Sequence, residues 1–291
     1  MLIRILKGTG IALLSLGVLV AGVYGYMYYQ VQSRINQKYV VQTPVLNIRY
    51  DSAQLAYGER LAIVKGCRDC HGDDMGGKVF VDDPGLGLLI GKNLTKGKGG
   101  LPIDYSTEDW VLALKHGIRR DGKTLLFMPS YEFTHLSEED MSAIIAYAQS
   151  LQPVDRELPD HNLKPLSYIL ASLDKLPLIV AEKIDHSTEL IKQVKSEVSV
   201  DFGKYLSTSC TGCHRPNMKG GDPIAPGFPV VPDVTTSGNV GKWTEDQFIT
   251  VLRTGRTPEG KEIDPKNMPW PMTAAYTDTE LKALYAYLKS I

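Results

Sequence analysis

The sequence predicts an all-α protein in which one membrane-crossing helix precedes two copies of a small helical domain. Three observations support this: an uncharged apolar stretch near the start, a domain-sized internal repeat, and apolar residues at helical spacing with almost no strand alternation. With 291 residues, 43% of them hydrophobic, the chain has material for one large or two ordinary cores. Its 32 basic and 33 acidic residues leave a formal net charge of −1, which removes the usual electrostatic argument for nucleic-acid binding.

The first expected element is a transmembrane anchor over residues 1–34. No charged residue lies between Lys7 and Arg34, and about twenty helical residues span the roughly 30 Å of a bilayer core. Tyrosines gather at the distal end, where phenol rings sit at headgroup level. A cleaved secretory signal is the alternative, but its apolar part is usually about 7 to 15 residues and ends in a small-x-small site. Cations on both sides of the stretch leave its orientation open.

Residues 51–151 and 200–291 are two versions of one pattern. Cys67-Arg68-Asp69-Cys70-His71 returns as Cys210-Thr211-Gly212-Cys213-His214, and Met128-Pro129 returns as Met268-Pro269. The repeated unit is as large as a domain, so it indicates a duplication and not a solenoid of short repeats.

Each copy is expected to contain about three helices. In the first copy they begin near Ser52, after Thr107 and at Ser137, and the first of them ends at Gly66, just before the cysteines. The second copy repeats these signals with capping-box starts at Thr244 and Thr277. The Gly- and Pro-rich stretches 85–102 and 222–241 are expected to be long loops.

The repeated C-x-x-C-H pattern is the attachment signature of a c-type haem. Two thiols three positions apart can each add to one vinyl group of the same porphyrin, and the next residue, histidine, supplies a nitrogen ligand to iron. A thioredoxin-like pair lacks its strand-rich context here, and a zinc site would need the two distant pairs to combine. The sequence therefore predicts two covalently bound haem c groups, held by Cys67, Cys70 and His71 and by Cys210, Cys213 and His214.

Methionines are the candidates for the second axial position of each iron. A thioether ligand raises the potential of haem iron, as suits an electron carrier. Met128 and Met268 are expected to be these ligands, because they are equivalent under the repeat and each precedes a proline in a loop ahead of the last helix. Met75 and Met218 follow the histidines too closely to reach the opposite face of the haem.

The rivals to these methionines have no equivalent in the other copy. His135 lies in the same loop as Met128, but its counterpart is Ala275, and the counterpart of Met272 is Glu132. The remaining histidines, on helical or linker segments, are expected to be hydrogen-bonded or exposed residues.

These motifs resemble class I cytochromes c, in the diheme, membrane-anchored form found as electron-transfer subunits of bacterial respiratory chains and dehydrogenase complexes. The resemblance covers residues 51–291 and includes the loop Asn93-Leu94-Thr95 and both Met-Pro segments. The first copy with its trailing segment is also similar to cytochrome subunits of periplasmic alcohol and aldehyde dehydrogenases. Those commonly carry three haem motifs, whereas this chain has two.

The resemblance implies iron ligation by His71 with Met128 and by His214 with Met268, and docking of redox partners at an exposed haem edge. It also implies thioether formation outside the cytoplasmic membrane, which places the haem domains in the bacterial periplasm and the N-terminus of the anchor in the cytoplasm. Between the copies, the linker 152–199 carries enough apolar residues to pack against a domain, and we expect it to set the distance between the haems.

The predicted function is single-electron transfer through two haems, without bond chemistry on a substrate. Expected partners are a membrane oxidase, a quinol-oxidising complex or a periplasmic dehydrogenase. The alternative is a diheme peroxidase, which needs an open iron and placed acid-base groups, and two matched Met-Pro segments leave neither iron obviously open. A haem-based sensor would need a signalling domain, and none is visible in the sequence.

Overall fold

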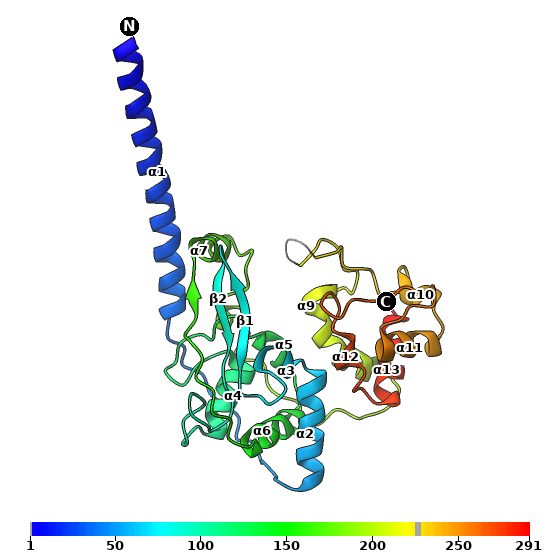
Figure 1. Cartoon of the computed structure of the whole chain (residues 1–291). Coiled ribbons are helices and arrows are strands. Elements are labelled where there is room, and N and C mark those ends of the chain that lie inside the picture. Colours follow the sequence, from blue (N-terminus) through cyan, green and yellow to red (C-terminus); the bar gives the residue numbers. More distant parts are fainter. Residues whose placement is uncertain (1, 225–227) are drawn as a thin grey trace.

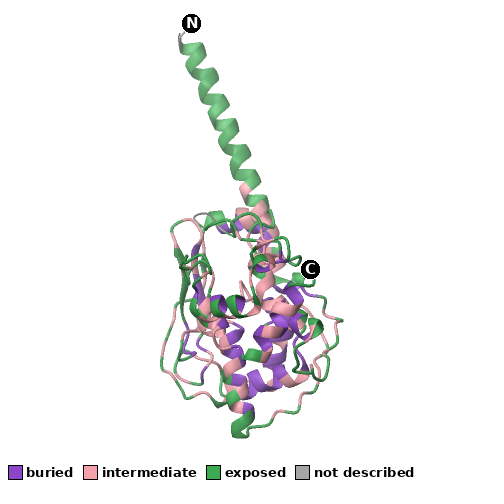
Figure 2. Ribbon diagram, turned by 90° about the vertical axis from the view of Figure 1, so that its right-hand side faces the viewer, coloured by how far each residue is buried: buried purple, intermediate pink, exposed green. Residues whose placement is uncertain are grey.

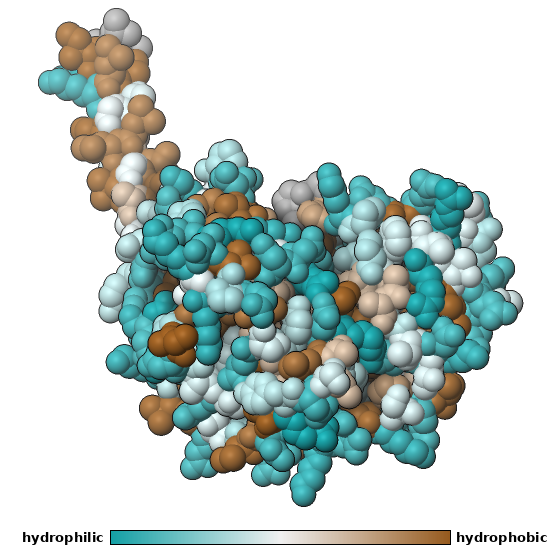
Figure 3. Space-filling model, turned by 60° about the horizontal axis from the view of Figure 1, so that its bottom comes forward, coloured by the Kyte–Doolittle hydropathy of each residue, from teal (hydrophilic) through white to brown (hydrophobic). Residues whose placement is uncertain are grey.

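The computed structural model describes residues 2–224 and 228–291, and it is mostly helical, as predicted. Helix α1 (Leu2–Asn36) projects from a globular part made of two lobes that lie side by side (Figure 1). By length and composition, one helix among the described residues is apolar enough to cross a membrane, Ile3–Asn36. The projecting part of α1 is exposed along its length and mostly hydrophobic, whereas the globular surface is mixed (Figures 2 and 3).

The first lobe follows α1 and contains the first C-x-x-C-H segment. Its helices begin and end close to the predicted positions, with Asp51, Ser106 and Ser137 as their N-caps. Gly117 ends the second long helix in the left-handed conformation. The helices of this lobe are α2 (Ser52–Val64), α3 (Cys67–His71), α4 (Thr107–His116), α5 (Ser130–Phe133) and α6 (Glu138–Ser150).

The second lobe repeats this order after the linker. The capping boxes predicted at Thr244 and Thr277 are both formed, by Gln247 and Glu280 respectively. The helices of this lobe are α8 (Val200–Ser207), the 3₁₀ turn η2 (Thr208–Cys210), α9 (Thr211–His214), α10 (Asn239–Lys242), α11 (Glu245–Thr254), α12 (Trp270–Thr273) and α13 (Asp278–Leu288).

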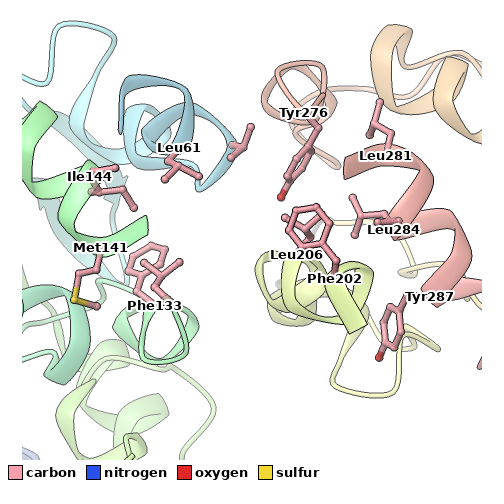
Figure 4. Packing of buried hydrophobic residues seen from close by; sticks show 14 of the residues in the cluster. Leu61, Phe133, Met141, Ile144, Phe202, Leu206, Tyr276, Leu281, Leu284 and Tyr287 are labelled. Atoms are coloured by element: carbon pink, nitrogen blue, oxygen red, sulfur yellow. The ribbon is translucent and has the colours of Figure 1, made fainter. Parts of the chain in front are cut away.

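A glycine at a helix crossing shows how closely the two lobes correspond. A Cβ added to Gly58 in α2 would lie 2.0 Å from the carbonyl oxygen of Ala143 in α6. In α8, a Cβ on Gly203 would lie at the same 2.0 Å from the carbonyl oxygen of Ala283 in α13. Each lobe therefore has its first and last long helices in backbone contact, and the core forms around this crossing (Figure 4).

The sequence did not predict the small antiparallel sheet of the first lobe, and part of it occupies the stretch expected to be a loop. Strands β1 (Lys78–Asp83) and β2 (Gly87–Gly91) form a hairpin, and β2 also pairs with β3 (Asn162–Leu163) from the linker. The apolar residues of β1, Val79, Phe80 and Val81, are consecutive, so the strand lacks the apolar–polar alternation that marks a half-buried strand. The turn forms because the Asp83 carboxylate accepts hydrogen bonds from the backbone N–H groups of Gly85 and Leu86.

Past β3, the linker lies against the first lobe and the base of α1. It contains α7 (Pro165–Ser172) and the 3₁₀ turn η1 (Ala181–Lys183). Leu178, Ile179 and Val180 are almost fully buried. The backbone N–H groups of Val180 and Ala181 both donate to the Thr124 hydroxyl.

Candidate haem sites

The first C-x-x-C-H segment forms one turn of helix, α3, directly after Gly66. Cys67 and Cys70 are free thiols three positions apart, so they lie on the same side of the turn. The Nδ1 atom of His71 lies 2.7 Å from the carbonyl oxygen of Lys92. Because a carbonyl only accepts, Nδ1 carries the proton and Nε2 keeps the lone pair that iron needs.

The second segment has the same arrangement. Cys210 ends η2, and Cys213 and His214 belong to α9. His214 Nδ1 lies 3.0 Å from the carbonyl oxygen of Pro232, so its Nε2 is also the free nitrogen. Both segments therefore offer two thiols on one side of a turn and an imidazole oriented by a backbone carbonyl, which fits a c-type haem.

The four cysteines are half-buried, and their thiols lack the lowered pKa that marks a reactive cysteine. Burial raises the pKa of Cys67 to about 12 and that of Cys70 to about 11. In the second lobe, burial raises the pKa of Cys210 to about 11. A redox-active cysteine needs the opposite shift, since the thiolate is the reacting form. Among the described residues, no group of three or more His, Cys, Asp or Glu side chains is placed to hold a metal ion.

Met128 and Met268 lie in matching local structures. Each is half-buried against the core, and its carbonyl oxygen accepts a hydrogen bond from the backbone two residues on, at 2.8 Å and 2.7 Å respectively. The prolines that follow, Pro129 and Pro269, have nearly equal backbone angles and start the short helices α5 and α12. This equivalence supports the two methionines as a pair with one role.

The remaining histidines have other surroundings. His135 is exposed. His161 Nδ1 accepts a hydrogen bond from the backbone N–H of Ile90. His116 is fully buried, with its Nδ1 3.1 Å from Nδ1 of His186, and burial lowers its pKa to about 4. The sequence did not indicate this pair, because its members are distant in the chain and neither has a counterpart in the repeat.

The two attachment segments approach each other across the contact between the lobes, which Figure 1 shows with α9 on the side of the second lobe that faces the first. Lys65, two residues before Cys67, donates a 3.1 Å hydrogen bond to the hydroxyl of Ser209, one residue before Cys210. Lys65 is only 6% exposed, and burial lowers its pKa. A single side chain thus joins the two segments.

The short helices after the Met-Pro pairs contribute to the same contact. A Cβ on Gly212, inside the second motif, would lie 2.7 Å from Oε1 of Glu132. A Cβ on Gly66, beside the first motif, would lie 3.5 Å from the sulfur of Met272. Glu132 and Met272 are counterparts in the repeat. Each lobe therefore uses the equivalent residue of its short helix to contact the attachment segment of the other lobe. Burial raises the pKa of Glu132 to about 7.

Comparison with known proteins identifies these segments. The model of the cytochrome c family matches residues 55–152 and 200–291. The chain belongs to the cytochrome c family. Cytochromes c carry covalently bound haem c, and two matched domains with two attachment segments hold two haems. The chain is therefore a diheme cytochrome c, an electron-transfer protein.

Several of its relatives are named as cytochrome subunits of dehydrogenases. The chain is 27% identical over 270 residues to the cytochrome c subunit of a quinone-type alcohol dehydrogenase from Gluconobacter oxydans, covering 83% of this chain and 55% of that subunit. It is 26% identical over 259 residues to the fructose dehydrogenase cytochrome subunit of Gluconobacter japonicus, covering 81% and 52%. It is 25% identical over 272 residues to the gluconate 2-dehydrogenase cytochrome c subunit of Pantoea cypripedii, covering 83% of this chain and 60% of that subunit. The chain thus spans about half the length of these curated relatives.

Proposed function

We propose that this cytochrome c is the membrane-anchored electron-transfer subunit of a periplasmic dehydrogenase complex, and that electrons pass directly between its two haems. The observation that carries the proposal is the approach of the two attachment segments through Lys65 and Ser209. The proposed parts are the anchor 1–34, haem domains 51–151 and 200–291, and the linker 152–199. The names of the relatives support a dehydrogenase as the partner.

The chain's own residues would hold each haem. Haem c, when bound, takes up and releases one electron at its iron. The carbonyl groups of Lys92 and Pro232 orient His71 and His214, which would each supply one nitrogen ligand to iron, and Met128 and Met268 would supply the sulfur ligands. A neutral thioether favours ferrous iron and so raises the potential.

Replacement of single methionines tests the ligand assignment. The far-red charge-transfer band of a Met-ligated ferric haem should be about halved in Met128→Leu and in Met268→Leu, while Met272→Leu, the matched control from the same segment, keeps it. Potentials of the affected haem should fall by part of the roughly 0.8 V range that axial ligands span. An unchanged band in the first two variants, or its loss in the third, would refute the assignment.

The second part of the proposal is the orientation of the chain across the membrane. Covalent attachment of haem c takes place outside the cytoplasmic membrane, so both lobes must lie in the periplasm and the N-terminus of α1 in the cytoplasm. Protease added to intact spheroplasts should digest both haem-bearing lobes. Protection of the lobes until the membrane is broken would contradict this orientation.

The partner is tested with membranes that contain the full chain. Purification in mild detergent should retain a dehydrogenase subunit, and a substrate of that subunit should reduce both haems. Alcohols, fructose and gluconate are the first substrates to try, since the relatives are named as cytochrome subunits of alcohol, fructose and gluconate dehydrogenases. A chain that purifies alone and turns over hydrogen peroxide through a high-spin haem would instead support the peroxidase alternative.

A further inference from the structure

Helix α7 has its polar and apolar sides reversed relative to a normal surface helix. Its small and polar residues face the protein: Ser167, Tyr168 and Ala171 are at most 9% exposed. Its large aliphatic residues face outward, with Leu166 42% exposed and Leu173, at the C-terminal end, 53% exposed. The half-buried Ile169 and Leu170 lie between these two exposed residues on the same side of the helix. The four are spaced at i, i+3, i+4 and i+7 and form one continuous stripe: Leu166, Ile169, Leu170 and Leu173.

The inward side of α7 is held by hydrogen bonds and not by apolar packing alone. The hydroxyl of Ser167 donates to the carbonyl oxygen of Leu86 at 2.6 Å, and that of Ser172 donates to Gln30 at 2.7 Å. Tyr168 accepts a hydrogen bond from the amide of Gln32 at 3.0 Å. The aliphatic stripe is therefore turned outward by well-made contacts on the other side of the helix.

The position of α7 beside α1 indicates which surroundings the aliphatic stripe faces. In Figure 1, α7 lies at the top of the first lobe, on the side from which α1 projects. The ring of Tyr168 lies 4.8 Å from that of Tyr28, and Arg34 binds both the Ala171 carbonyl and Asp174. Tyr28 belongs to the group of tyrosines expected at headgroup level. Helix α7 thus lies at the depth where α1 leaves the membrane.

We propose that α7 lies in the headgroup layer of the membrane with its aliphatic stripe towards the acyl chains. It forms a second membrane contact, which fixes the orientation of the first lobe beneath the bilayer. The inference rests on the proposed anchoring by α1. Exposed lysines at both ends of α7, Lys164 and Lys175, are placed to reach lipid phosphates while the aliphatic side chains stay in the apolar layer.

Spin labels on single introduced cysteines test the proposal in the full chain. The four native cysteines are consumed by haem attachment, so an introduced thiol is the one that reacts. Labels go at Leu166→Cys and Leu173→Cys, with Leu14→Cys in the middle of α1 as the membrane reference and Val45→Cys, at a 99% exposed position, as the water reference. The protein is placed in nanodiscs of phosphatidylethanolamine and phosphatidylglycerol. Collision of each label with oxygen, enriched among acyl chains, is compared with collision with a water-soluble nickel complex.

The proposal expects the oxygen-to-nickel ratio at Leu166 and Leu173 to exceed that at Val45 several-fold and to approach that at Leu14. A water-like ratio at both α7 positions, with a lipid-like ratio at Leu14, would overturn the α7 contact and leave the anchor intact. A water-like ratio at Leu14 would instead refute the anchor itself. Spin–spin broadening at Leu166 would show that a second copy covers the stripe, and would also overturn the proposal.

Discussion

At the level of single residues, the position after each C-x-x-C-H motif has a backbone conformation suited to glycine. Gly72 has φ 80° and ψ 162°, and its counterpart Arg215 has φ 66° and ψ 164°. Side chains are strained there, at a cost of about 1–3 kcal/mol. The first lobe has a glycine at this position, whereas the second lobe has an arginine.

Arg215→Gly should therefore stabilise the second lobe by about 1 kcal/mol, less than the full strain because glycine also has more freedom in the unfolded chain. Thermal unfolding followed by haem absorbance measures the change. Gly72→Ala is the converse variant, and it should destabilise the first lobe. A lower melting temperature for Arg215→Gly would show that the side chain, through its 3.1 Å hydrogen bond to the Asp222 carbonyl, matters more than the strain.

The proposed haem-attachment residues can be named one by one from the sequence, because the chemistry of haem attachment dictates their types and spacing, and their role stays a prediction. The equivalence of Met128 and Met268 also followed from the repeat alone, and their role as ligands stays a prediction. Lys65 and Glu132 were not predicted as site residues, since their importance comes from the other lobe, and a sequence does not show which surfaces of two domains meet.

At the level of elements, the caps were the most predictable feature. Ser137, Thr244 and Thr277 cap the helices that the sequence assigned to them, because an N-cap is a local contact within three residues. At the other two starts the cap lies one residue earlier than expected, at Asp51 and Ser106. The sheet of the first lobe escaped prediction because β2 pairs with linker residues distant in the chain.

The glycine crossing gives a prediction for α2 and α8. Gly58→Ala and Gly203→Ala each place a methyl group within 2.0 Å of a carbonyl oxygen on the facing helix, so the helices must separate. We expect each variant to lose about 3 kcal/mol of unfolding free energy. Urea denaturation measures it, with Lys204→Ala, at the exposed neighbouring position of α8, as the matched control. Losses in the glycine variants no larger than in the control would contradict this packing.

At the level of the whole molecule, the lobes meet in a contact that is nearly two-fold symmetric. Arg60, two residues after Gly58, binds Glu280 of the second lobe at 2.7 Å and 3.1 Å. Tyr205, two residues after Gly203, donates to Asp140 of the first lobe at 2.6 Å. Asp140 and Glu280 are counterparts in the repeat, so the duplicated domains contact each other through equivalent positions.

Breaking one half of this contact should loosen the pairing of the lobes. Arg60→Ala leaves the Glu280 carboxylate, 5% exposed, with its capping contact to Thr277 alone. We expect a loss of about 2–3 kcal/mol, less than for a fully buried pair because Arg60 is 27% exposed. The control is Arg256→Ala, whose partner Glu262 is exposed, and it should cost less than about 0.5 kcal/mol. Urea denaturation distinguishes the two, and equal small losses would show that the lobes do not depend on this ion pair.

The central claim is that the two haems exchange electrons directly within one molecule, across the contact that joins Lys65 to Ser209. Flash photoreduction of a small fraction of the haems, followed by the absorbance change as electrons redistribute, tests it most directly. The account predicts a first-order redistribution whose rate constant does not change when the protein is diluted. A rate that falls in proportion to protein concentration would show that electrons move only between molecules, and would contradict the account.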